Sequence, residues 1–156
     1  MSVKKLNLWI GGEYRPAKDN AVFIDHNPID DRPYAEVAKA SADDVHLAVE
    51  AAHAAFASYR TTTPGQRETW LSRAADLLEQ RKDAFADVLI DEIGSPLLKA
   101  HFEIKYAIAH LRTASGIPRR ITGQTLPSDV PGRFSMSVRE PLGVFACITP
   151  FNVPLI

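Results

Sequence analysis

The sequence predicts an α/β fold, and three observations support this prediction. Near the start of the chain, two short apolar stretches flank Gly11 and Gly12, as in a tight β-hairpin. In the middle, apolar residues recur at helical spacing behind capping residues. Later, the continuous apolar run from Val144 to Ile148 suits a strand that is buried on both faces of a parallel sheet.

The first forty residues predict short strands. Residues 6–10 and 13–15 are separated only by the two glycines, which tolerate the positive φ angles of a hairpin turn. Residues 22–24 form a further extended piece, and residues 35–40 predict another strand. The chain is therefore expected to open with a β-hairpin and to continue with two more strands.

Two capping boxes predict helices next. Ser41 is an N-cap with Asp44 three residues later, and Thr63 repeats the pattern with Pro64 at the first helical position and Gln66 closing the box. Apolar residues follow both caps at helical spacing, namely Val45, Ala48, Val49, Ala52, Phe56, Leu71, Ala74, Ala75 and Leu78. Both segments are expected to be amphipathic helices.

The helical pattern continues to Gly94 and restarts after Ser95 and Pro96. This last helix is expected to end at Gly116. One of its faces carries the apolar residues Leu98, Phe102, Tyr106 and Ala109.

A long connecting loop is expected after Gly116, because residues 117–133 hold several prolines and glycines and no apolar period. In residues 134–140 apolar and polar side chains alternate, so this strand has one apolar face and needs a partner. We expect this chain to provide no partner for that apolar face. The isolated chain is therefore expected to aggregate or to stay partly unfolded.

Composition limits the partners and the location. Acidic and basic residues nearly cancel, at 19 against 18, so neither nucleic acid nor a membrane surface is an expected partner. No apolar run approaches the roughly 20 residues of a membrane-spanning helix, and the apolar stretch near the start is too short for a signal peptide. A cytoplasmic protein is expected. The single cysteine excludes an internal disulfide and a zinc site of several thiolates.

The loop of residues 149–152 is the strongest candidate site. It follows the predicted buried strand and precedes a predicted helix, which is where open α/β sheets bind their ligands. The side-chain amide of Asn152 carries two uncharged donors that can be directed at an oxygen gaining negative charge. The alternative is that Asn152 only caps the helix expected near Pro154. Cys147, among apolar neighbours, is expected to be a buried structural thiol rather than a nucleophile.

The order of these segments resembles the amino-terminal part of the NAD(P)-dependent aldehyde dehydrogenases. The resemblance covers nearly the whole chain and includes the stretches WIGGEY, DLLEQRKDAF, IDEIGSP and FSMSVREP. Its most specific part is GVFACITPFNVPL, where Pro-Phe-Asn stands in the place of the proline, the aromatic residue and the oxyanion asparagine of that family. Val153 departs from the family, which often has phenylalanine there.

The resemblance implies a doubly wound cofactor domain of which only part is present. Residues 1–133 are expected to be the amino-terminal part of the cofactor-binding domain, and residues 134–140 a strand used in oligomerisation. Residues 141–156 are expected to hold the first strand and the catalytic loop of the nucleotide-binding unit, truncated. The chain is thus expected to be an amino-terminal fragment that is inactive alone, from a parent that forms a homodimer or a homotetramer.

The resemblance also implies the roles of the site residues. The nicotinamide end of NAD or NADP is expected to contact, mainly through backbone, Ile148, Thr149, Pro150 and Phe151. Asn152, which closes the cofactor-binding stretch, is expected to donate to the oxygen of a small-molecule aldehyde during its oxidation to a carboxylic acid. The attacking cysteine and the glutamate that activates water are expected beyond residue 156, since Cys147 does not match the nucleophile's motif.

Two alternatives stay open at this point. An acylating semialdehyde dehydrogenase passes the acyl group to coenzyme A or phosphate instead of water. A non-catalytic homologue keeps the fold for binding or assembly. The sequence does not choose between NAD and NADP, nor does it identify the aldehyde.

Overall fold

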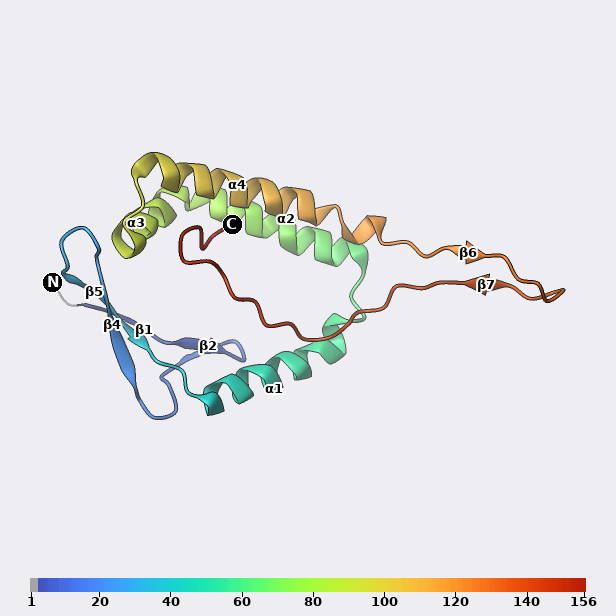
Figure 1. The fold of residues 1–156 in the computed structure, drawn as a ribbon, viewed down its shortest axis with the longest axis horizontal. Coiled ribbons are helices and arrows are strands. Elements are labelled where there is room, and N and C mark those ends of the chain that lie inside the picture. Colours follow the sequence, from blue (N-terminus) through green and yellow to red (C-terminus); the bar gives the residue numbers. More distant parts are fainter. Residues whose placement is uncertain (1–2) are drawn as a thin grey trace.

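The computed structural model describes residues 3–156. Short strands occupy one end of the molecule, the paired helices α2 and α4 run along one side, and α1 runs along the other (Figure 1). A narrow arm projects from the opposite end, and the chain returns from this arm towards the α2–α4 pair. The last residues therefore approach the helices from the open side of the molecule.

The predicted hairpin is confirmed. Strands β2 (Leu8–Ile10) and β3 (Glu13–Arg15) pair in antiparallel fashion, with Trp9 opposite Tyr14. The turn residues Gly11 and Gly12 have φ values of 65° and 86°. Positive φ at both central positions is what a two-residue hairpin turn needs, and glycine adopts it without steric cost.

The other two predicted strands are also confirmed. Strand β5 (Pro33–Ala38) lies between β1 (Lys4–Leu6) and β4 (Val22–His26). It runs parallel to β1 and antiparallel to β4. This small sheet joins the start of the chain to the segment that leads into the first helix.

Both predicted capping boxes form. Helix α1 (Ala42–Tyr59) begins behind Ser41, and helix α2 (Pro64–Gln80) begins behind Thr63, each with reciprocal bonds between the cap and the third helical residue. These bonds satisfy backbone N–H groups that have no partner within the helix. Local sequence therefore fixed the start of both helices correctly.

Helices α2, α3 (Lys82–Ile93) and α4 (Leu97–Ser115) enclose the main core. Helix α3 ends at Gly94, whose φ of 64° is the left-handed conformation of a helix C-terminus. The buried cluster consists of Leu78, Ala86, Leu89, Ala100, Ile104 and Ala107. Small residues on α4 allow α2 and α4 to lie side by side.

The face of α4 that the sequence singled out is not the buried one. Leu98, Phe102 and Tyr106 are 85%, 51% and 45% exposed. The buried face lies on the other side of the helix and carries Ala100, Glu103, Ile104 and Ala107. Helix α4 is therefore apolar on two sides, and within residues 3–156 only one side is packed into the core.

The arm contains the short strands β6 (Thr125–Leu126) and β7 (Ser135–Met136), reached through a 3₁₀ turn, η1 (Pro118–Arg120). The two strands pair in antiparallel fashion. The strand predicted for residues 134–140 is thus shorter than expected. Strand β6, which forms within the segment predicted as loop, pairs with the edge of β7. The apolar face of the predicted strand stays uncovered, since Phe134, Met136 and Val138 are 74%, 62% and 67% exposed.

The strand predicted for residues 144–148 does not form. These residues have no strand neighbour within the described part of the chain and are largely exposed, with Phe145 at 69% and Ile148 at 97%. A parallel strand is stable only with hydrogen-bonded neighbours and helices on its faces, and residues 3–156 supply none around this run. An apolar run of this kind favours a buried strand, but the strand forms only where neighbouring strands and covering helices are present.

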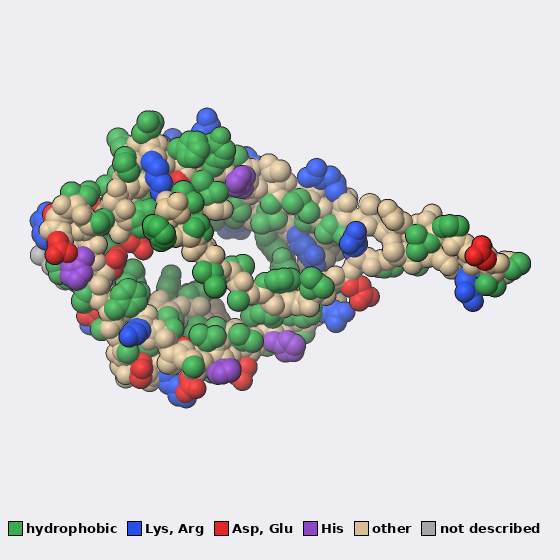
Figure 2. All heavy atoms as spheres, in the orientation of Figure 1, with side chains coloured by type: hydrophobic (Ala, Val, Ile, Leu, Met, Phe, Trp, Pro, Cys, Tyr) green, Lys and Arg blue, Asp and Glu red, His purple; other side chains and the backbone are tan. Residues whose placement is uncertain are grey.

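The molecule exposes far more surface than a compact protein of its mass. Its accessible area is 12011 Å² for 17.2 kDa, whereas a compact monomer of this mass exposes about 7,800 Å². Apolar side chains line open space on both sides of the returning segment (Figure 2). Within the described residues, no helix is long and apolar enough to cross a membrane.

Candidate functional site

The candidate site is the turn at residues 151–155, where the chain returns to the helices. The N–H of Ile156 donates to the carbonyl oxygen of Val153 at 3.3 Å, which closes the turn. The four residues that follow Asn152 form this turn and are too few to test the alternative capping role. The side-chain amide of Asn152 makes no hydrogen bond within residues 3–156.

All five residues predicted to bind the cofactor lie on the surface. Ile148 is 97% and Phe151 is 89% exposed, and Thr149, Pro150 and Asn152 are also exposed. They follow one another along the extended chain and present backbone and side chains to open space. Their roles in cofactor binding and catalysis stay predictions.

Asn152 and Phe151 line a cavity of about 430 Å³. The cavity is also lined by the connection between α3 and α4, which contributes Gly94, Ser95 and Pro96, together with Pro28 and Lys99. The hydroxyl of Ser95 is buried and has no hydrogen-bond partner among the described residues. The cavity is therefore lined by both apolar residues and polar ones, the latter including Ser95 and Asn152.

Glu92 adds a carboxyl to this cavity. Partial burial raises the pKa of Glu92 above its ordinary value, and the negative charge of Asp25 raises it further. A carboxyl under these influences takes up a proton more readily than a free one.

Glu103 anchors the turn to helix α4. Its side chain is completely buried. One carboxylate oxygen accepts the backbone N–H of Leu155 at 2.7 Å, and the other accepts Lys99 Nζ at 2.6 Å. The side chain of Leu155 packs against the main core cluster. The turn that holds Asn152 is therefore fixed to the core at a position three residues further along.

Sequence reasoning missed Glu103. The signal was present, because Ala100, Glu103, Ile104 and Ala107 follow the i, i+3, i+4, i+7 spacing of a buried helix face. A carboxylate on such a face needs a hydrogen-bonding partner. The partner could not be foreseen, since Leu155 lies 52 residues away in the sequence.

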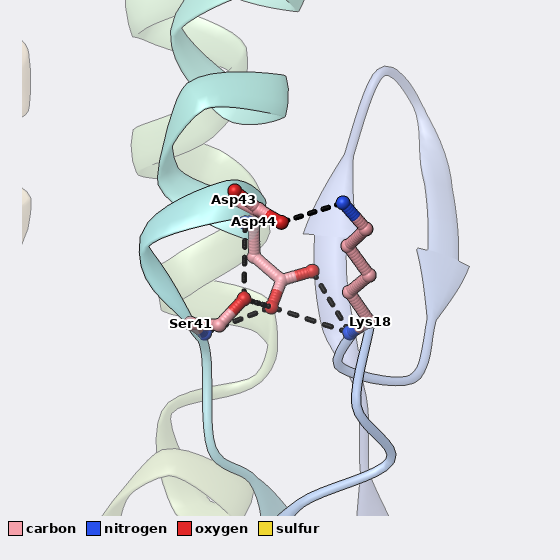
Figure 3. Close-up of polar contacts among 4 residues, drawn as sticks. All are labelled: Lys18, Ser41, Asp43 and Asp44. Atoms are coloured by element: carbon pink, nitrogen blue, oxygen red, sulfur yellow. Dashed lines mark hydrogen bonds and ion pairs between the residues drawn. The ribbon is translucent and has the colours of Figure 1, made fainter.

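A second polar cluster fixes the start of α1 against the segment after the hairpin (Figure 3). The Asp44 carboxylate accepts the backbone N–H and hydroxyl of Ser41 at 2.8 and 2.7 Å, and the backbone N–H of Lys18 at 3.0 Å. Lys18 Nζ binds Asp43 at 2.5 Å. These bonds organise the fold and lie outside the candidate site.

The expected burial of Cys147 was wrong. It was expected to be buried, but it is exposed, because the strand that was to contain it does not form in this structure. No group of three or more His, Cys, Asp or Glu side chains that could hold a metal ion occurs in the described residues.

Ile148 and Phe151 expose apolar side chains, and Asn152 exposes an uncharged amide. These groups are of the kind that suits the flat nicotinamide ring of a dinucleotide, and their contact with it stays a prediction. The phosphates need backbone donors of the glycine-rich kind. The sequence contains no G-x-G-x-x-G motif to supply them.

Known proteins resemble this chain along nearly its whole length. The profile of the aldehyde dehydrogenase family matches residues 14–156. Vanillin dehydrogenase of Pseudomonas sp. strain HR199 is 39% identical over 149 residues, which cover 96% of this chain and 31% of that protein.

Solved structures agree in fold. A NAD-dependent benzaldehyde dehydrogenase from Corynebacterium glutamicum matches at a TM-score of 0.77 and 35% identity, over 81% of this chain and 28% of that one. An NADP-dependent enzyme of E. coli matches at 0.94 and 30% identity, over 97% and 32%. The chain spans about a third of the length of these relatives. The predicted α/β class is confirmed, and the chain belongs to the aldehyde dehydrogenase family.

Proposed function

We propose that the natural protein containing this chain oxidises an aldehyde to a carboxylic acid with NAD or NADP. Residues 148–151 contact the nicotinamide end of the cofactor, and Asn152 donates hydrogen bonds to the aldehyde oxygen. The observation that carries this proposal is the position of Asn152, an exposed residue that lines a cavity and whose side-chain amide has no hydrogen-bond partner among the described residues. Relatives named as dehydrogenases that use NAD or NADP support the cofactor.

The chemistry suits an asparagine. An aldehyde oxygen gains negative charge when the carbonyl carbon is attacked, and a donor fixed beforehand at that oxygen stabilises the charge without reorganising. The amide carries two N–H donors and no charge, so it adds no net positive charge that would bind the carboxylate product. The nicotinamide of the bound cofactor supplies the hydride acceptor.

The nucleophile and the general base belong to residues beyond 156 in this proposal. A cysteine thiolate would add to the aldehyde carbon, and the hydride that leaves this carbon would pass to the oxidised nicotinamide, so that the adduct becomes a thioester. A glutamate would activate the water that hydrolyses the thioester to the carboxylate and releases the thiol. The coverage of the relatives supports this assignment, since the chain spans only 31% of vanillin dehydrogenase. Residues 1–156 alone are then inactive.

The arm belongs to the same proposal. Residues 1–133 are the amino-terminal part of the cofactor domain, residues 134–140 contribute to a homodimer or homotetramer interface, and residues 141–156 open the nucleotide-binding unit. The exposed apolar side chains of the arm, Leu126, Val130, Phe134, Met136 and Val138, support an interface there.

The test is Asn152→Ala in the full-length natural protein. We expect kcat for benzaldehyde oxidation to fall roughly 10²- to 10³-fold, the usual loss when one oxyanion donor is removed. The measurement is NADH or NADPH formation under saturating cofactor. The control is Asn7→Ala, which removes an exposed amide between β1 and β2 and should leave kcat unchanged. An unchanged kcat in Asn152→Ala would contradict the catalytic role.

Two rival functions have separate readouts. An acylating enzyme makes an acyl ester of coenzyme A or phosphate and gives little free carboxylate, which product analysis with and without these acceptors detects. A non-catalytic homologue gives neither product and lacks a cysteine and a glutamate at the matching positions of the natural chain. Formation of free carboxylate without an acceptor supports the hydrolytic enzyme.

A further inference from the structure

Glu103 is an unusual residue to find on the buried face of a helix. It is completely buried, and its neighbours on the same face are Ala100, Ile104 and Ala107, also buried. A carboxylate removed from water loses its hydration and is retained only where charge and hydrogen bonds replace it. An apolar residue at this position would fill the same face without that requirement.

The two partners of Glu103 do different things. Lys99 lies one turn earlier on the same helix and is 31% exposed, so its ammonium neutralises the carboxylate but joins no separate parts of the fold. The N–H of Leu155 belongs to the returning segment and connects it to α4 across 52 residues of sequence. This second bond matters for the candidate site, because it holds the turn that contains Asn152 against α4.

Asn152 depends on this connection for its position. The chain before it is exposed from residue 144 to residue 152. After it, Pro154 has a fixed φ angle, and the bond from Ile156 N–H to the Val153 carbonyl oxygen closes the turn. Only two residues separate Asn152 from the anchored Leu155, so the anchor restricts where the Asn152 amide can point.

We propose that Glu103 is a positioning residue for the reaction, holding the Asn152 amide in place through its bond to the Leu155 N–H. The inference rests on the proposed function, because Asn152 is the donor that it positions. A misplaced donor loses transition-state stabilisation even when substrate and cofactor still bind. The role of Glu103 should therefore show in kcat more than in KM.

The test compares two changes at Glu103 in the full-length natural protein. Glu103→Leu removes the acceptor while keeping similar volume, and apolar replacement of a buried ion is often well tolerated by the fold. Glu103→Gln combined with Lys99→Met keeps an acceptor oxygen for Leu155 and removes the ammonium that would compete for it. We expect Glu103→Leu to lower kcat roughly 10- to 100-fold with KM for the cofactor unchanged, and the double variant to recover most of the loss.

A second comparison separates positioning from general stability. In the Asn152→Ala background, Glu103→Leu should lower kcat no further, since the donor that Glu103 positions is already absent. Independent, multiplicative losses would overturn the proposal. So would equal losses in Glu103→Leu and in the acceptor-keeping double variant. The matched control is Glu79→Gln, an exposed carboxylate on α2 that pairs with Arg112 of α4 and should leave kcat unchanged.

Hydrogen exchange at the Leu155 amide distinguishes the two possible failures. Protection that is lost in Glu103→Leu and kept in the acceptor-keeping variant establishes the anchor. If the anchor is present and Asn152→Ala leaves kcat unchanged, the proposed function has failed and the positioning role with it. If Asn152→Ala lowers kcat but Glu103→Leu does not, only the positioning role has failed.

Discussion

The Asp44 carboxylate joins two segments of chain that are far apart in sequence. It accepts three hydrogen bonds from Ser41 and Lys18 and lies at the positive end of α1. The bonds from the Ser41 backbone and hydroxyl are the main reason that its pKa lies below the ordinary value, and the Lys18 backbone and charge contribute. Asp44 should therefore stay ionised at pH values where a free aspartate takes up a proton.

The pKa of Asp44 gives a prediction with a defined sign. A carboxyl whose pKa is lower in the folded state stabilises the fold above its unfolded pKa of about 3.9, and this stabilisation is lost as pH falls through the folded value. Asp44→Asn should lower the melting temperature of the full-length protein at pH 7 and have a smaller effect near pH 3. A loss of the same size at both pH values would contradict the role of the charge.

Single residues were predictable where the partner is close in sequence. Ser41 and Asp44 form the expected cap, because a capping box is a pattern within four residues. The bond from Lys18 to Asp44 and the bond from Leu155 to Glu103 span 26 and 52 residues, so no local pattern contains them. For the candidate site, sequence therefore singled out Asn152 as a predicted donor, but it identified neither the bond to Glu103 that anchors the turn nor the other residues that line the cavity.

At the scale of elements, helix positions followed from sequence and helix orientation did not. The start of α4 and its glycine end were predicted from Pro96 and Gly116. Its apolar residues, however, lie on two faces, and periodicity does not say which face meets a neighbour. The face with Phe102 is exposed, and the face with Ile104 is buried. Close approach to α2 favours the face with alanines, because small side chains allow it.

Gly94 connects α3 to the wall of the candidate site. It adopts a φ of 64°, and a Cβ added there would lie 2.9 Å from Cγ of Pro28. A side chain at this position would therefore combine backbone strain with a close contact. Both effects act on the connection that lines the same cavity as Asn152.

Gly94→Ala should destabilise the full-length protein by about 1 to 2 kcal/mol from the left-handed backbone alone, and by more because of the contact with Pro28. Gly132→Ala is the matched control, since Gly132 has a φ of 75° and open space around its Cβ position. Urea unfolding of both variants measures the difference. Equal losses would show that Pro28 moves aside without cost.

At the scale of the whole molecule, the large exposed apolar surface indicates that several elements lack packing partners within the described residues. Val45 and Val49 of α1 are 56% and 50% exposed, although the sequence placed both on the apolar face of an amphipathic helix. The apolar residues 144–148 are likewise exposed. These segments have the composition of buried elements, and the helical core of α2, α3 and α4 is too small to cover them.

This surface predicts the behaviour of residues 1–156 produced alone. With 12011 Å² accessible, against about 7,800 Å² for a compact monomer of this mass, the isolated chain should associate through its exposed apolar faces or lose fixed tertiary structure outside the helical core. We expect strong binding of the dye ANS and a broad thermal transition. Light scattering coupled to size exclusion should show species larger than 17.2 kDa. A monomer with a sharp two-state melt and no dye binding would mean that the apolar faces pack together within the chain.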